Sequence, residues 1–272
     1  MPELPEVETT LRGIRPCIEK QIIRQCISRR AKLRWPVPVD ALQRLAGHAI
    51  LAVSRRGKYL LLKTVLGTII IHLGMSGHLR VVPHALTVGK HDHFDIVFVN
   101  GYTLRLTDPR RFGAVLWAPL PDPLLHPVLC QLGVEPLSAQ FTAHHLQQQL
   151  NQTSRSIKLA LMDQAKVVGI GNIYANEALF RARIHPASKA NQLSLVRLQS
   201  LVTAIKTVLR SAIKQGGTTL KDYINSQGQP GYFGQTLQVY GRAGSACYRC
   251  GTGLQLLRLD GRSTVYCSQC QC

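Results

Sequence analysis

The chain has 272 residues, with 33 Lys and Arg against 14 Asp and Glu, which gives a formal net charge of +19. Because 45% of the residues are hydrophobic and no apolar run reaches the roughly 18 residues that span a bilayer, the composition excludes a disordered chain and a helical membrane protein. The excess of positive charge predicts an acidic partner, most commonly nucleic acid.

The N-terminus concentrates acidic residues in this basic chain, at Glu3, Glu6 and Glu8. One interpretation is structural, since acids in the first turn of a helix complement its dipole. The other is catalytic. Removal of Met1 would expose the secondary amine of Pro2, and an α-amino group with a pKa near 8 is partly unprotonated at neutral pH, so it can attack a sugar carbon and form an iminium. The segment lacks the features of a signal peptide, and we expect a soluble, cytoplasmic protein.

Residues 50–119 alternate short runs rich in Val, Ile, Leu and Tyr with glycine or proline, which predicts an antiparallel β region. The expected strands are 58–65, 68–73, 93–99 and 102–107. Basic residues at the ends of these strands suit phosphates, and the glycine-flanked Met75 and Phe112 are candidates for apolar tips that wedge between bases. The alternative is that both are ordinary turn residues that fold back on the core.

The remaining chain is predicted to be a proline-rich linker followed by helices. Five prolines in 119–136 favour a linker over a regular element. Helical periodicity predicts a helix from Leu195, capped by Ser194, that ends at Gly216. Further helical segments are expected at 158–166 and 174–180, and the glycine turn between them is either a plain connection or a phosphate site with Asn172.

Four cysteines are spaced as metal ligands. They form two C-x2-C pairs separated by sixteen residues: Cys247, Cys250, Cys267 and Cys270. Two tight turns on a hairpin supply the tetrahedron of thiolates that Zn²⁺ prefers, and a four-thiolate site is closed to water, which predicts one structural zinc ion. Two disulfides are the alternative, but thiols stay reduced in the cytosol. The scattered Cys17, Cys26 and Cys130 are expected to be buried as small hydrophobic residues.

Taken in order, the motifs resemble those of bacterial formamidopyrimidine-DNA glycosylase, the 8-oxoguanine DNA glycosylase and AP lyase of base excision repair. They are PELPEVET, RRGKYL, HLGMSG, KHDHF, DPRRFG, VVGIGNIYANEALF, GGTTLKDY, GQPGYF, VYGR, CYRC and GRSTVYCSQC. The resemblance implies an α+β fold: an N-terminal catalytic antiparallel β-sandwich domain and a C-terminal helical helix-two-turns-helix domain with a zinc-finger β-hairpin. The expected ranges are 1–118 for the first domain, 119–136 for the linker, 137–234 for the helical domain with a lesion loop, and 235–272 for the finger.

The resemblance also implies roles for individual residues. Pro2 would be the nucleophile at the sugar C1′, Glu3 the general acid for ring opening, and Lys58 and Arg262 the groups that transfer protons in the β,δ-elimination that cuts the strand. Glu6 would line the lesion pocket, which the loop 218–232 closes. Further positions correspond to phosphate contacts or to residues that fill the hole left by a flipped nucleotide. The phosphate contacts are His72, His91, Arg111, Lys158, Asn172 and Arg262; the hole is filled by Met75, Arg110 and Phe112, with Arg110 also contacting DNA.

The implied partner is double-stranded DNA that contains oxidised bases or abasic sites, bound by a monomer with no membrane association. One departure concerns Thr153, where the family often has a basic residue, and Arg155 is the candidate substitute. A non-catalytic, zinc-dependent DNA-binding protein is one alternative function. The other is an endonuclease VIII-like enzyme for oxidised pyrimidines, whose relatives usually begin PEGPE and lack GQPGYF, whereas this chain has Leu4 and GQPGYF.

Overall fold

The computed structural model describes residues 2–218 and 233–272. By internal contacts the chain divides into two units: a first unit of residues 1–130 and 215–234, and a second unit of residues 131–214 and 235–272. The domain ranges expected from the sequence remain predictions. Within the described part of the chain, no helix has the length and apolar character required to cross a membrane.

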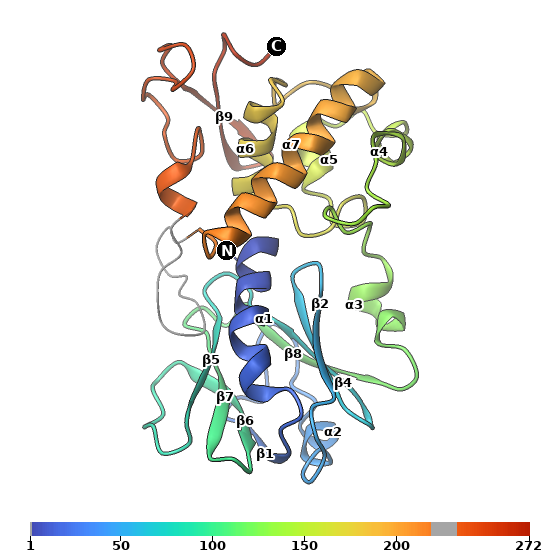
Figure 1. The fold of residues 1–272 in the computed structure, drawn as a ribbon, viewed down its shortest axis with the longest axis vertical. Coiled ribbons are helices and arrows are strands. Elements are labelled where there is room, and N and C mark those ends of the chain that lie inside the picture. Colours follow the sequence, from blue (N-terminus) through green and yellow to red (C-terminus); the bar gives the residue numbers. More distant parts are fainter. Residues whose placement is uncertain (1, 219–232) are drawn as a thin grey trace. The chain divides into compact units, whose positions relative to one another are not determined.

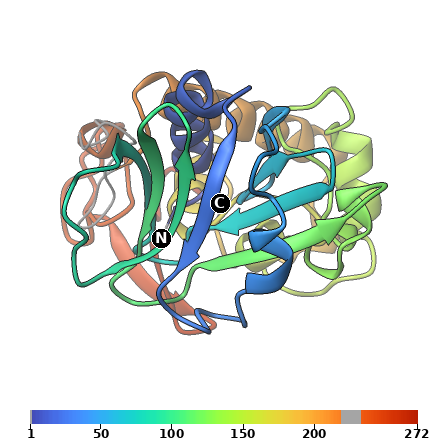
Figure 2. The same cartoon turned by 90° about the horizontal axis from the view of Figure 1, so that it is seen from below.

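The first unit contains one long helix and two four-stranded antiparallel sheets (Figures 1 and 2). The helix is α1 (Leu4–Ile18). One sheet has the order β1 (Ile23–Ser28), β6 (Asp92–Phe98), β7 (Tyr102–Thr107) and β5 (His78–Pro83), and the other has the order β2 (Ala52–Arg56), β3 (Tyr59–Lys63), β4 (Gly67–His72) and β8 (Ala114–Pro119). The short elements of this unit are α2 (Val39–Gln43), η1 (Pro123–Leu125) and α3 (Pro127–Cys130).

The core of the first unit lies between α1 and both sheets. The apolar face of α1 is fully or almost fully buried through Val7, Leu11, Ile14 and Ile18, which pack with inward-facing residues of all eight strands. Burial of each such side chain contributes about 1.5–3 kcal/mol relative to exposure. This packing fixes the position of the N-terminal turn of α1, where the predicted nucleophile and acids lie.

The second unit is helical and ends in a β-hairpin. Its helices are α4 (Ala143–Leu150), α5 (Ile157–Leu161), α6 (Asn172–Arg181) and α7 (Leu195–Lys214), with the 3-10 turn η2 (Ala190–Gln192). The turn η3 (Phe233–Thr236) precedes the last segment. There β9 (Gln255–Leu259) and β10 (Arg262–Tyr266) pair antiparallel through an Asp260-Gly261 turn, and both turn residues have positive φ, as a type I′ turn requires.

The structure confirms the α+β class, the predicted helix from Leu195 and the expected strands, whose ends move by one or two residues. The helix predicted over 158–166 is wrong beyond Leu161. There the side chain of Gln164 replaces helical hydrogen bonding: Nε2 donates to the carbonyls of Met162 and Ile170, each at 2.9 Å, and Oε1 accepts from the N–H of Gly169 at 2.8 Å. One side chain thus organises the two turns between α5 and α6.

The proline-rich segment is also more regular than expected. It contains η1 and α3, because the Oδ1 atom of Asp122 caps the N–H of Leu124 at 2.9 Å and Pro127 occupies the first position of α3, which suits proline. The expected burial of the scattered cysteines is wrong as well, since Cys17 and Cys130 are exposed and Cys26 is only half-buried.

Candidate functional site

The N-terminal turn of α1 is organised by two acids. Pro2, Glu3 and Glu6 are buried, and Glu3 and Glu6 form a capping box in which the N–H of Glu3 donates to Oε2 of Glu6 at 2.8 Å. The other oxygen of Glu6, Oε1, accepts from the N–H of Thr218 at 2.8 Å. Glu6 therefore joins the turn beside Pro2 to the start of the predicted lesion loop, of which residues 219–232 lie outside the described part of the chain.

Lys58 lies in the tight hairpin between β2 and β3, and this hairpin is tied to α1. Gly57 has a φ of 57°, and the guanidinium of Arg55 donates both to the carbonyl of Gly57 at 2.8 Å and to Glu8 of α1 at 3.1 Å. Burial by itself would raise the pKa of Glu8, but hydrogen bonds from Arg12 and Arg55 outweigh it and the pKa is lowered. Glu8 is thus an ionised link between the helix that carries Pro2 and the hairpin that carries Lys58.

His72 lies directly opposite Tyr59 across β3 and β4, with ring centroids 4.8 Å apart. Burial, reinforced by the positive charges of Lys58 and Arg34, lowers the pKa of His72 to about 4. Its Nδ1 accepts the N–H of Gly74 at 3.0 Å, so the neutral ring carries its proton on Nε2. The structure therefore places His72 beside Lys58 as an uncharged hydrogen-bond donor.

Two neighbouring loops hold the predicted wedge residues at the surface. We define the Met75 loop as residues 73–77, between β4 and β5, and the Phe112 loop as residues 108–113, between β7 and β8. The side chains of Met75 and Phe112 are 40% and 46% exposed, so neither folds back on the core. The Arg110 guanidinium lies 5.2 Å from the centroid of the Phe112 ring, and both flanking arginines, Arg110 and Arg111, are exposed.

His91 borders the Phe112 loop from the turn directly before β6. Its carbonyl accepts the N–H of Asp108 at 2.9 Å, and its half-buried ring packs edge-on against His93. In the first unit the structure therefore brings Lys58, His72 and His91 to the bases of the two loops.

In the second unit, Lys158 and Asn172 converge on the finger hairpin. Nζ of Lys158 donates to the Ser263 carbonyl at 2.9 Å and to Oγ1 of Thr264 at 2.7 Å, while Nδ2 of Asn172 donates to the same Ser263 carbonyl at 3.1 Å. Lys158 is buried and Asn172 half-buried. These bonds fix β10 against the start of α6 at the position next to Arg262.

Arg262 is an exposed side chain at the hairpin turn. Its guanidinium donates to Asp260 at 3.1 Å, and that of Arg155 lies 3.9 Å from the same carboxylate. Thr153 is half-buried and uses its hydroxyl to accept the N–H of Arg155 at 3.4 Å. Arg155, the candidate substitute for the missing basic residue, thus shares the Asp260 carboxylate with Arg262.

The four predicted ligand cysteines come together at the end of the second unit. Their sulfur atoms all lie within 4.8 Å of one another, with separations of 3.5 Å for Cys250 to Cys267, 3.5 Å for Cys250 to Cys270 and 4.0 Å for Cys247 to Cys270. These distances exclude disulfides, whose sulfurs are about 2.05 Å apart. A tetrahedron with metal–sulfur bonds of about 2.3 Å has sulfurs about 3.8 Å apart, so the cluster fits a metal ion.

Sequence reasoning missed several residues that position these groups. Asp108, the first residue of the Phe112 loop, is fully buried, and Glu177 of α6 accepts three backbone N–H groups, from Gln238, Val239 and Tyr240, at 2.9–3.0 Å. Asn176 Oδ1 accepts the N–H of Val265 at 2.9 Å. The sequence signal that could have found Asp108 and Glu177 was the rarity of acidic residues. Only 14 occur in the chain, and these two are buried.

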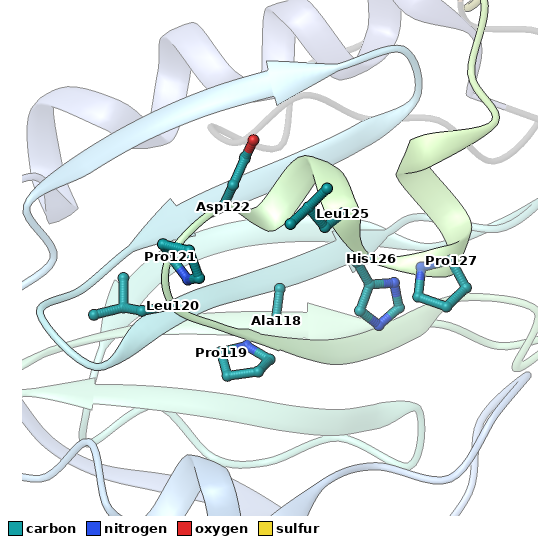
Figure 3. A pocket seen from close by; sticks show the side chains of 8 residues that line it. All are labelled: Ala118, Pro119, Leu120, Pro121, Asp122, Leu125, His126 and Pro127. Atoms are coloured by element: carbon teal, nitrogen blue, oxygen red, sulfur yellow. The ribbon is translucent and has the colours of Figure 1, made fainter.

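A cavity of about 300 Å³ lies at the end of β8. Residues 118–122 and 125–127 line it, and Figure 3 shows their side chains. None of the sequence-predicted site residues contributes to this cavity.

The chain is similar to known proteins over its full length. The model of the formamidopyrimidine-DNA glycosylase N-terminal domain matches residues 1–115, and that of the formamidopyrimidine-DNA glycosylase H2TH domain matches residues 132–223. The formamidopyrimidine-DNA glycosylase of Shewanella amazonensis is 56% identical over 271 residues, covering 100% of this chain and 99% of the relative.

Two solved structures are also similar to nearly the whole of this chain. The MutM (Fpg) protein of Thermus thermophilus has a TM-score of 0.89 and 39% identity, covering 99% of this chain and 98% of that one. Lactococcus lactis Fpg in complex with DNA containing an abasic site has a TM-score of 0.91 and 34% identity, covering 99% of both chains.

Proposed function

The chain belongs to the formamidopyrimidine-DNA glycosylase family, and from this premise we propose that it excises oxidised purines, namely 8-oxoguanine and formamidopyrimidines, from double-stranded DNA and then cuts the strand. The observation that carries the proposal is the pair of loops with exposed apolar tips, Met75 and Phe112, of which Phe112 follows the exposed Arg110 and Arg111. Apolar wedges with adjacent cations suit insertion into a base stack whose backbone is anionic. A target base must leave the stack before its sugar can react.

The chemistry is assigned to the N-terminal turn. After removal of Met1, the Pro2 nitrogen attacks C1′, the glycosidic bond breaks, and the base leaves with a proton. Glu3 donates a proton to the ring oxygen, which opens the deoxyribose and gives the iminium. The place of Pro2 directly before the N-terminus of α1 favours the uncharged, nucleophilic amine, because the positive end of the helix dipole disfavours a further positive charge there.

Strand cleavage requires two eliminations from the iminium. Removal of a C2′ proton expels the 3′ phosphate, and removal of a C4′ proton expels the 5′ phosphate. Lys58 and Arg262 are assigned to proton transfer in these steps. Lys58 is supported by its hairpin, which is tied through Arg55 and Glu8 to the helix that follows Pro2.

DNA binding is assigned to the phosphate-facing groups of each unit. In the first unit these are His72, which donates as a neutral ring, His91, Arg110 and Arg111. In the second unit Arg262 is the exposed cation, and Lys158 and Asn172 support it because both bind the carbonyl of the adjacent Ser263. Affinity that depends on phosphates falls steeply with salt and is indifferent to sequence.

Lesion recognition is assigned to the region around Glu6. Its carboxylate accepts the backbone N–H groups of Glu3 and Thr218, which fixes the orientation of Glu6 beside Pro2. The expectation that residues 218–232 close over the purine falls, from residue 219 on, outside the described part of the chain.

The cysteine cluster is proposed to hold one structural zinc ion. Four thiolates with tetrahedral spacing favour Zn²⁺ and leave no open coordination position, so the ion supplies folding energy to the finger and takes no part in the reaction. A monomeric, cytoplasmic enzyme completes the proposal.

The test compares four duplexes: one with 8-oxoguanine opposite cytosine, one with an oxidised pyrimidine, one with an abasic site and one undamaged. The proposal predicts strand cutting of the first and third and only weak, salt-sensitive binding of the undamaged duplex. Faster cutting at the pyrimidine would favour the endonuclease VIII-like alternative. Sequence-selective binding without any cutting would favour a non-catalytic DNA-binding protein.

A further inference from the structure

The Met75 loop and the Phe112 loop are joined by a buried hydrogen-bond network. The side chain of Ser76 is 5% exposed, and that of Asp108 is fully buried. The Ser76 hydroxyl donates to Oδ1 of Asp108 at 2.9 Å and accepts the N–H of Arg110 at 3.2 Å. A single hydroxyl therefore connects the loop that carries Met75 to two points of the loop that carries Phe112.

Asp108 also closes the Phe112 loop on itself. Its Oδ2 accepts the N–H of Gly113 at 2.7 Å, and its backbone carbonyl accepts the N–H of Arg111 at 3.2 Å. The ring of His93 donates to the same carbonyl through Nε2 at 3.0 Å. Hydrogen bonds to a buried carboxylate are among the stronger ones in proteins, so the loop has little freedom to change shape.

The two loops also touch directly through their backbones. A Cβ atom added to Gly74 would lie 2.4 Å from the Gly113 nitrogen and 2.4 Å from the Phe112 carbonyl carbon. Gly74 has a φ of 65°, which glycine adopts without strain. The absence of a side chain at this position permits a close approach between the residue before Met75 and the residues at the tip of the other loop.

We infer that Ser76 and Asp108 are positioning residues that make the two loops one rigid body, so that Met75 and Phe112 enter the base stack together rather than independently. This inference rests on the proposed wedge function, and it identifies the hydrogen bonds that hold the two wedge residues in position. Each tip is partly exposed, and the buried bridge between Ser76 and Asp108 lies in the same two loops, so it fixes the backbone that carries both tips. A preformed pair of wedges avoids the loss of conformational freedom on insertion that two independent loops would incur.

The experiment uses the full chain and a duplex with 8-oxoguanine next to 2-aminopurine, a base whose fluorescence rises when it is unstacked. The variant Ser76→Ala removes the bridging hydroxyl but leaves the bond from Gly113 to Asp108. We expect the fluorescence rise on mixing, and single-turnover excision with it, to slow about tenfold, as fits the loss of a hydrogen bond to a charged group. Cutting of a duplex with an abasic site, from which no base is extracted, should change less than twofold.

The matched control is Thr64→Ala. Thr64 is also buried, and its hydroxyl donates to the Gly67 carbonyl at 2.9 Å and accepts the Leu66 N–H at 3.2 Å in the turn before β4. This variant removes a similar hydroxyl at the opposite end of β4 from the Met75 loop. It should lower the melting temperature as much as Ser76→Ala does and leave the fluorescence rise as in the wild type.

A second variant, Asp108→Asn, keeps an oxygen for Ser76 but turns an amide N–H2 toward the N–H of Gly113, so it should slow the fluorescence rise as well. Wild-type rates in a Ser76→Ala variant that folds as well as the control would overturn the inference. Failure of the wedge function itself would look different: Phe112→Ala would then give the same fluorescence trace as the wild type.

Discussion

The substitution Glu177→Gln tests how the finger segment is held to α6. Glu177 is buried, and its two oxygens accept three backbone N–H groups at the start of the segment that leads to the cysteines. Glutamine has nearly the same shape but only one acceptor oxygen. Its amide N–H2 must face at least one of these N–H groups, which then loses its partner inside the protein.

The expected loss of stability follows from the number of N–H groups that lose their acceptor. A buried donor left without a partner costs about 1–3 kcal/mol, and the bonds that remain lose the contribution of a charged acceptor. For a unit of about 120 residues, a loss of about 2 kcal/mol lowers the melting temperature by about 8 °C. The segment that leads to the four cysteines begins at these N–H groups, so the same loss of stability should also speed release of the metal ion.

The assay is thermal unfolding of the metal-loaded protein together with the rate at which a chromogenic chelator captures the ion. The control is Glu19→Gln, which removes a carboxylate from an exposed ion pair with Arg15 and should leave the melting temperature nearly unchanged, because solvent screens such pairs. If Glu177→Gln melts within a degree of this control and releases metal at the wild-type rate, Glu177 does not anchor the finger.

Three further predictions concern the metal, the wedge and pH. Cys247→Ser should release zinc, measured by metal analysis, and abolish DNA binding, and wild-type affinity in the metal-free protein would refute the structural role. Phe112→Ala should weaken extraction of 8-oxoguanine more than binding of undamaged duplex, and an equal loss on both would argue against the wedge. Because His72 has a folded pKa of about 4, below that of the unfolded chain, its contribution to stability is complete above about pH 6.5 and is lost as the pH falls toward 4. Between pH 7 and pH 5 the wild type should lose on the order of 2 kcal/mol more than His72→Gln in denaturant titrations, and parallel curves would show that His72 does not titrate this way.

The elements with strong periodicity or spacing were predictable from the sequence. The helix that starts at Leu195 and the paired C-x2-C turns follow from local chemistry: an apolar face that repeats every 3.6 residues in one case and thiolates at the ends of tight turns in the other. The resemblance to the family added the roles of residues such as Pro2 and Arg262, which no periodicity could supply.

The residues that position the site were not predictable in the same way. Three of these residues, Asp108, Gln164 and Glu177, form hydrogen bonds to backbone groups. Every residue type has a backbone, so the sequence does not show which residues will be their partners. In the structure the helix predicted over 158–166 ends at Leu161. Beyond that residue the side chain of Gln164 takes the place of helical backbone hydrogen bonds. A side chain that satisfies three backbone groups is visible only once the turns around it are known.

The loops illustrate the same limit. The glycines around Met75 and Phe112 indicated turns, but exposure and burial were equally compatible with that pattern. In the structure Gly74 lies against the backbone of Phe112 and Gly113 in the other loop, a contact that the local sequence around either tip does not reveal.

The central claim is that Pro2 forms a covalent iminium with the sugar of a damaged nucleotide. The most direct test is borohydride trapping on a duplex with 8-oxoguanine opposite cytosine, with wild type compared with Pro2→Gly and with a form that retains Met1. We expect a stable protein–DNA adduct for the wild type and a strong loss of adduct in the other two. An adduct that forms equally well with Met1 retained, or none from zinc-loaded wild type on any oxidised duplex, would contradict it.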